Sequence, residues 1–175
     1  LRDALVAGIN LNIFNNHCDR VKMANIAQLI NVLQSVILTE GEKMILTPTY
    51  HVFDMYKVHQ DAELLPITLE SGEYRFGEES IPQVSASASM DAEGKIHISI
   101  CNLSHADPAD IDCSLRGSTA AKVSGTILTA PVMNAHNTFQ DPERIKPEAF
   151  NGASIKDGAL KATLPPMSVV VLTVE

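Results

Sequence analysis

The side chains that could carry chemistry in this chain of 175 residues are few and stand far apart in the sequence. The nearest approach to a metal-binding pair is His51 and His59, eight residues apart in a segment with helical spacing. Eight helical residues rise roughly 12 Å along the axis, so one ion cannot reach both side chains. The chain also lacks GxGxxG, P-loop, GxSxG and HExxH motifs. We therefore expect no metal site, no cofactor and no nucleophilic hydrolase centre.

Cysteine chemistry is equally limited. The three cysteines, Cys18, Cys101 and Cys113, are an odd number at wide spacing and form no CxxC pair. We expect structural roles for all three. Cys101 and Cys113 lie in neighbouring strand-like segments and could form a disulfide, so the redox compartment stays open.

Paired carboxylates and exposed aromatic rings are the remaining candidates. The carboxylate pairs are Glu78 with Glu79 and Asp110 with Asp112, and we expect both to be solvated charges at turns and strand edges. Aromatic residues total only 5% and tryptophan is absent, so flat platforms for sugar rings are scarce. The aromatic residues of one predicted helix are expected to pack inward instead: Tyr50, Phe53 and Tyr56.

Composition and charge describe a globular chain. Hydrophobic residues make up 45%, enough for a core, and the formal net charge is -8. Without a basic cluster the chain is unsuited to nucleic acid. The longest apolar runs, such as residues 169–172, are far below the roughly 18 residues that span a bilayer, so we expect a soluble protein with no membrane partner. Because the sequence opens on Leu1 in an amphipathic pattern, we expect it to begin inside a longer protein.

Three segments near the start predict helical or mixed structure. Apolar positions recur at three- and four-residue spacing over residues 1–14, which predicts an amphipathic helix that ends at Asn15, Asn16 and His17. Residues 48–59 predict another helix, with Thr47 as N-cap and Pro48 at the first helical position. Between them, residues 21–38 are ambiguous between a helix and a buried strand followed by a helix or loop.

After Ala62 the chain changes to short alternating runs separated by turn residues, which is typical of an antiparallel β-sandwich. In the clearest run, Ile96, Ile98 and Ile100 share one face. A polar stretch at 131–152 is too long for a hairpin and is predicted to be functional or to wrap a partner domain. The expected strands are residues 64–69, 84–90, 95–102, 111–116, 122–128, 160–164 and 168–174.

Four stretches carry a family resemblance: DRVKMANIAQLINV at 19–32, TPTYHVFDMY at 47–56, MNAHNTF at 133–139 and LPPMSVVVL at 164–172. Together they resemble, in order, the C-terminal third of the α-L-arabinofuranosidases of glycoside hydrolase family fifty-one. The resemblance covers nearly the whole chain. In that family a (β/α)8 barrel carries catalysis and a jelly-roll β-sandwich packs against it.

The resemblance implies a division of this chain into two parts. Residues 1–62 would be the terminal strand and helices of the barrel, with the last barrel strand inside residues 21–38, and residues 63–175 would be the accessory β-sandwich. Barrel active sites lie at the carboxyl ends of strands. Gln28 falls at such an end and matches a sugar-binding glutamine of the family, so the resemblance implies that Gln28 is a substrate ligand.

The activity implied is retaining hydrolysis of terminal arabinofuranosyl groups by two glutamates, one acid/base and one nucleophile. In the family the acid/base follows an asparagine and the nucleophile is usually followed by a tryptophan. This chain has no Asn-Glu dipeptide and no tryptophan. Both glutamates are therefore expected upstream of Leu1, and residues 1–175 alone are predicted to be inactive on arabinose-containing glycans.

Two other interpretations stay open. The chain could be a free-standing, non-catalytic β-sandwich module that binds carbohydrate or protein, in which case residues 21–38 must be buried against its own sandwich. A parent enzyme acting on glucans or xylans is also compatible with these residues. Family members commonly form homo-oligomers, and the acidic balance does not reveal such an interface.

Overall fold

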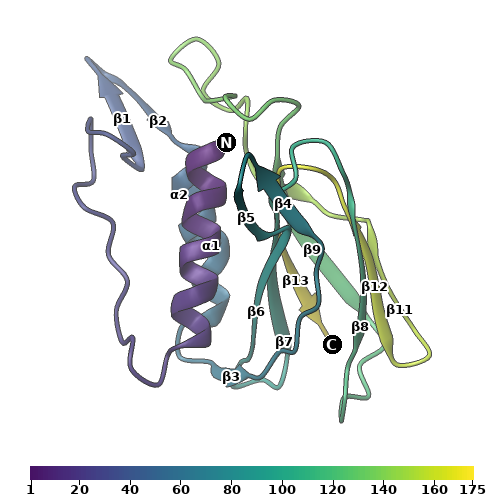
Figure 1. The fold of residues 1–175 in the computed structure, drawn as a ribbon. Coiled ribbons are helices and arrows are strands. Elements are labelled where there is room, and N and C mark those ends of the chain that lie inside the picture. Colours follow the sequence, from purple (N-terminus) through teal and green to yellow (C-terminus); the bar gives the residue numbers. More distant parts are fainter.

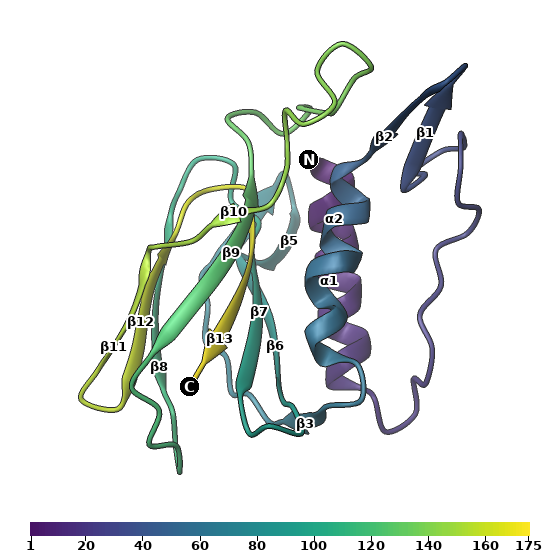
Figure 2. The same cartoon turned by 180° about the vertical axis from the view of Figure 1, so that it is seen from behind.

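The computed structural model describes all residues 1–175 and arranges them in a helical layer and two sheets (Figure 1). The helical layer consists of α1 (Arg2–Asn16), α2 (Pro48–Met55) and a 3-10 turn η1 (Tyr56–His59). Seen from behind, the helices cover one face of the larger sheet, and the smaller sheet lies on its other face (Figure 2). No helix has the length and hydrophobicity needed to cross a bilayer.

Within each of the two sheets, every pair of neighbouring strands is antiparallel, so the predicted β-sandwich is confirmed. The larger sheet has the order β10-β9-β13-β7-β6-β3 and the smaller one β11-β12-β8. The strands of the larger sheet are β3 (Glu63–Leu65), β6 (Val84–Met90), β7 (Ile96–Asn102), β9 (Val123–Thr129), β10 (Glu148–Ala149) and β13 (Ser168–Val174). Those of the smaller sheet are β8 (Ala109–Ser114), β11 (Ala153–Lys156) and β12 (Ala159–Leu164).

Two hairpins lie outside the sandwich, β1 (Ile37–Glu40) with β2 (Lys43–Leu46), and β4 (Glu73–Phe76) with β5 (Glu79–Pro82). The sequence patterns did not predict these hairpins, nor the short strands β10 and β11. Each of these strands has four residues or fewer, too few for an alternation to stand out.

Both faces of the larger sheet are buried. On β13, Val169 and Val171 belong to the core under the helices, whereas Val170 and Leu172 belong to the core between the sheets. This double burial explains why β13 is a nearly continuous apolar run without polar alternation. On β7 the predicted alternation is confirmed, because Ile98 and Ile100 point between the sheets and Cys101 faces the helices.

Both predicted helices form. The buried positions of α1 are Ala4, Leu5, Gly8 and Asn12, whereas two of the apolar positions that predict the helix, Val6 and Ile13, are 45% and 47% exposed. At the start of α2 the Thr47 hydroxyl accepts a hydrogen bond from the Tyr50 amide at 3.4 Å, with Pro48 in the first turn. The N-cap predicted from the sequence is therefore confirmed.

Residues 21–36 form neither the helix nor the buried strand considered from their composition. They are irregular apart from a parallel bridge between Ile30 and Ile37, and most of them are exposed. A buried parallel strand needs hydrogen-bonding strands on both sides, and this chain supplies only β1, which bridges the segment at Ile30. The disulfide considered between Cys101 and Cys113 is also wrong, because both thiols are free and belong to cores on opposite faces of the larger sheet.

Candidate functional site

Gln28, the one site residue implied by the sequence, is exposed on the segment that crosses the outer side of the helical layer. Its backbone has a left-handed φ of 57°, a conformation that a residue other than glycine adopts only when its neighbours hold it. Those neighbours are fastened to strand β1: the Ile37 amide donates to the Leu29 carbonyl at 3.2 Å, and the Asn31 amide donates to the Ile37 carbonyl at 3.1 Å.

The Asn31 side chain adds two hydrogen bonds to the same strand. Its amide nitrogen donates to the Thr39 hydroxyl at 2.8 Å, and its oxygen accepts from the Thr39 backbone amide at 2.7 Å. The position of Gln28 is thus set by β1 rather than by a strand of its own. Its exposed side chain has both a donor and an acceptor, and can therefore form hydrogen bonds with hydroxyl groups.

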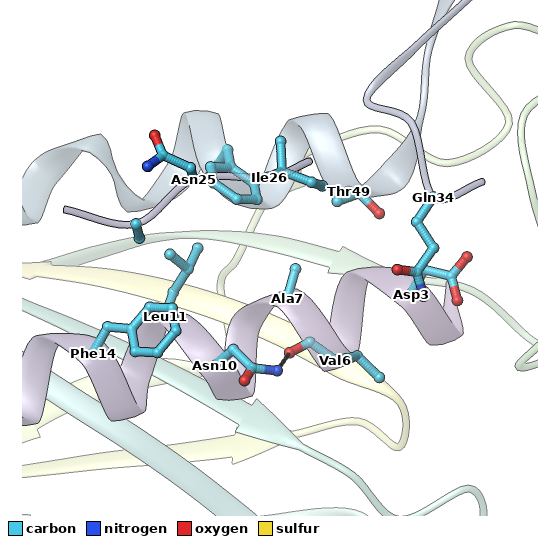
Figure 3. Close-up of a pocket in the computed structure, with 12 residues that line it drawn as sticks. Asp3, Val6, Ala7, Asn10, Leu11, Phe14, Asn25, Ile26, Gln34 and Thr49 are labelled. Carbon is cyan, nitrogen blue, oxygen red and sulfur yellow. Dashed lines mark hydrogen bonds between the residues drawn. The ribbon is translucent and has the colours of Figure 1, made fainter. Parts of the chain in front are cut away.

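A groove of about 260 Å³ separates the same segment from α1 and α2 (Figure 3). Apolar side chains line most of it, with Asp3 as the only carboxylate. A pair of carboxylates, which glycoside hydrolysis requires, is therefore missing from the groove. Gln28 does not line it. The labelled side chains include Val6, Leu11 and Phe14 of α1, Ile26 of the segment and Thr49 of α2.

The other nominated acidic pairs do not form a reacting site. Glu78 and Glu79 are exposed in the β4–β5 hairpin. Asp110 accepts a hydrogen bond from the Thr163 hydroxyl at 2.7 Å, and Asp112 forms an ion pair with Lys161. These contacts lie on the open face of the smaller sheet, where exposed pairs contribute little to stability. No group of three or more His, Cys, Asp or Glu side chains could hold a metal ion.

A buried polar network between α1 and the larger sheet was not predicted from the sequence. The Asn12 oxygen accepts hydrogen bonds from the hydroxyls of Ser87 at 2.9 Å and Ser99 at 2.7 Å. His59 joins them, with Nε2 3.0 Å from the Ser99 hydroxyl and Nδ1 2.7 Å from the Ser89 hydroxyl. The serines alternate on β6 in a pattern that predicts a solvent-facing strand, and only the docked helices make that face a polar interior.

Burial shifts the pKa values of three side chains between the helices and the larger sheet. It lowers the pKa of His59 to about 4, with His97 nearby acting in the same direction, so the imidazole is neutral at pH 7. Burial also raises the pKa of the Cys101 thiol to about 12 and that of the Tyr56 phenol above its usual value. A thiol that stays protonated is a poor nucleophile. The structural role expected for Cys101 fits this environment.

The sequence matches the α-L-arabinofuranosidase C-terminal domain family over residues 1–168. It is 46% identical over 176 aligned positions to an intracellular exo-α-L-arabinofuranosidase from Bacteroides ovatus, with 100% of this chain and 34% of that protein covered. An intracellular exo-α-(1→5)-L-arabinofuranosidase from Streptomyces lividans is 29% identical over 95% of this chain and 25% of that protein. The chain thus spans about a third or less of the length of these curated relatives.

Solved structures agree with the sequence relationship. The crystal structure of the family 51 arabinofuranosidase from Xanthomonas axonopodis pv. citri matches 98% of this chain and 35% of its own with a TM-score of 0.96 and 44% identity. The thermostable family 51 α-L-arabinofuranosidase from Thermotoga petrophila matches 98% of this chain and 38% of its own with a TM-score of 0.84 and 27% identity. From these matches and the helix-covered β-sandwich, we conclude that this chain belongs to the α-L-arabinofuranosidase C-terminal domain family.

Proposed function

We propose that this chain is the C-terminal portion of a retaining α-L-arabinofuranosidase. The parent enzyme removes terminal α-L-arabinofuranosyl groups from arabinan- or arabinoxylan-type polysaccharides and oligosaccharides. Support comes from the family match and from relatives whose names describe exo-acting arabinofuranosidases. The acid/base and nucleophilic glutamates lie in the upstream part of the parent, where two carboxyls about 5–5.5 Å apart perform the double displacement.

The observation that carries this proposal is the exposure of residues 21–36. A free-standing module would have to bury this apolar segment against its own sandwich, but Met23 is 75% exposed and Leu33 is 92% exposed. Leu29 and Ile30 are also about half exposed. Apolar side chains gathered on one segment at this exposure are typical of a surface that another part of the protein covers. In the proposal, that part is the remainder of the catalytic barrel.

The same proposal assigns residues 1–62 to the end of the barrel and residues 63–175 to the accessory sandwich. The two parts share a core, since Leu5 of α1 and Val52 of α2 belong to the same buried cluster as Val169 of β13. The sandwich therefore supports the barrel helices from outside. Its function in the parent is structural, while the barrel residues contact the glycan.

Gln28 is the proposed substrate ligand within this chain. In the full-length enzyme, Gln28→Ala should lower kcat/KM for an aryl α-L-arabinofuranoside by roughly tenfold or more, because loss of one sugar hydrogen bond costs about 1–3 kcal/mol. Gln60→Ala, which removes an exposed glutamine at the end of η1, is the matched control. Unchanged kinetics in Gln28→Ala would assign Gln28 a structural role only.

A further inference from the structure

The long connection between β9 and β10 folds over the N-terminal end of α1 and the β2 strand (Figure 1). It is anchored there by backbone hydrogen bonds, including one from the Arg2 amide to the Met133 carbonyl at 3.0 Å. Ala135 and Ile145 of this connection are buried in the core under the helices. Most residues of the connection are exposed and lack regular structure, but these two side chains join the packed interior at this end of the molecule.

Asn137 is the polar residue at the centre of this connection, and it is only 4% exposed. Its side-chain oxygen accepts from the Ile145 amide at 2.8 Å, and its side-chain nitrogen donates to the Ile145 carbonyl at 2.9 Å. The same nitrogen donates its second hydrogen to the Leu46 carbonyl at 2.9 Å. One amide therefore closes the loop on itself and ties it to the last residue of β2.

The contact at Leu46 is connected to Gln28, the proposed sugar-binding residue, through two paired strands. Strand β2 pairs with β1 from Leu46 opposite Ile37 to Lys43 opposite Glu40. Strand β1 in turn holds the two neighbours of the Gln28 turn, Leu29 and Asn31, by the hydrogen bonds already described. Without a strand of its own, Gln28 depends on this hairpin for its position.

We propose that Asn137 is a positioning residue for substrate binding: it fixes the β1–β2 hairpin against the sandwich and thereby holds Gln28 where it meets the sugar. This inference rests on the proposed function, because it takes Gln28 as a ligand. An asparagine suits the position because the site needs two donors and one acceptor without charge. Alanine offers none of these groups, and aspartate would place a carboxylate against the Leu46 carbonyl.

The test is a double-mutant cycle in the full-length enzyme, with kcat and KM measured on an aryl α-L-arabinofuranoside. Asn137→Ala should raise KM at least fivefold, with a smaller change in kcat. In the Gln28→Ala background the same substitution should change KM by less than twofold, because the contact that it positions is already absent. Asn134→Ala, an exposed asparagine of the same loop, is the control and should leave both constants unchanged.

Thr39→Val tests the same path from its other end, and it removes only the hydroxyl that accepts from Asn31. It should raise KM severalfold in the parent enzyme and have no further effect in Gln28→Ala, which keeps the proposal testable if Asn137→Ala does not fold. Equal KM increases in both backgrounds would overturn the positioning role. A Gln28→Ala enzyme with unchanged KM and kcat would instead overturn the ligand assignment on which it rests.

Discussion

At the scale of single residues, buried polar side chains of this chain form hydrogen bonds within the protein. Asn12, His59 and Asn137 are each hydrogen-bonded at least twice within the protein. A buried polar group without partners costs about 1–3 kcal/mol, so these networks also select one way of docking helices and loop on the sheet. Gln28, by contrast, keeps its side chain at the surface, where it is available for the proposed contact with the sugar.

His59 predicts a pH dependence of stability. Its pKa is about 4 in the folded chain against 6.5 when unfolded, so between these values the unfolded state binds a proton that the folded state does not. The free energy of unfolding should therefore be fully maintained above pH 6.5 and fall as the pH drops toward 4, by up to about 3 kcal/mol from this residue. Urea unfolding at pH 7.0, 5.5 and 4.5 measures this decrease in the free energy of unfolding.

The controls for that titration are two glutamine variants. His59→Gln should lose less stability than the wild type over this pH range, whereas His17→Gln, at an exposed histidine, should keep the wild-type slope. If His59→Gln and the wild type show the same slope, the buried imidazole is not the group that titrates.

At the scale of elements, the approach of α1 to the sheet depends on a glycine. A Cβ built on Gly8 would lie 2.7 Å from the Cys101 sulfur and 3.3 Å from the Tyr56 hydroxyl oxygen. The Tyr56 hydroxyl donates to the Gly8 carbonyl at 3.3 Å, so the helix is bonded as well as packed at this point. Larger residues here would push α1 away from β7 and strain the polar network one turn further along the helix.

Gly8→Ala should therefore destabilise the chain by about 1–3 kcal/mol, although the same change in an exposed helix stabilises by about 1 kcal/mol. Thermal and urea unfolding of Gly8→Ala, Cys101→Ala and the double variant measure the coupling free energy between the two positions. Because Cys101→Ala removes the sulfur that clashes, the two changes together should cost less than the sum of their separate costs. Strict additivity would show that the close approach is not what limits the helix.

At the scale of the whole molecule, the chain is a sandwich with a helical layer and one exposed, apolar segment. The sandwich and helices share a core, whereas residues 21–36 make few backbone hydrogen bonds and lie on the outer side of the helices. Amide exchange follows such local differences in stability. The amide exchange rates of the isolated chain and the full-length parent should therefore differ most in the exposed segment, residues 21–36.

Hydrogen–deuterium exchange tests the proposed barrel contact. Amides of residues 21–36 should exchange much faster in the isolated chain than in the full-length parent, because the neighbouring barrel strands would supply the missing partners. Amides of β7 and β13, which lie in the centre of the larger sheet, should be equally protected in both and serve as the internal control. Equal exchange of residues 21–36 in both proteins would contradict the assignment of this segment to the barrel.

Local patterns were sufficient where one interaction decides the structure. The N-cap at Thr47, the existence of helix α1 and the alternation of β7 each depend on neighbours within a few residues, so they could be predicted. The family resemblance likewise depends on sequence alone, and the comparisons confirm it. The short hairpins were missed because two strands of four residues or fewer carry little periodic signal.

The amino-acid pattern alone was enough to predict the sandwich class and the two helices, and it shows that the chain has no Asn-Glu dipeptide. The environment of the polar residues on β6 and the conformation of residues 21–36 depend instead on contacts between distant parts of the chain. The serines of β6 became interior because helices distant in sequence cover them, and residues 21–36 stayed irregular because no strand of this chain pairs with them on both sides. Burial and strand pairing are long-range properties, and hydrophobic periodicity along the chain does not contain them.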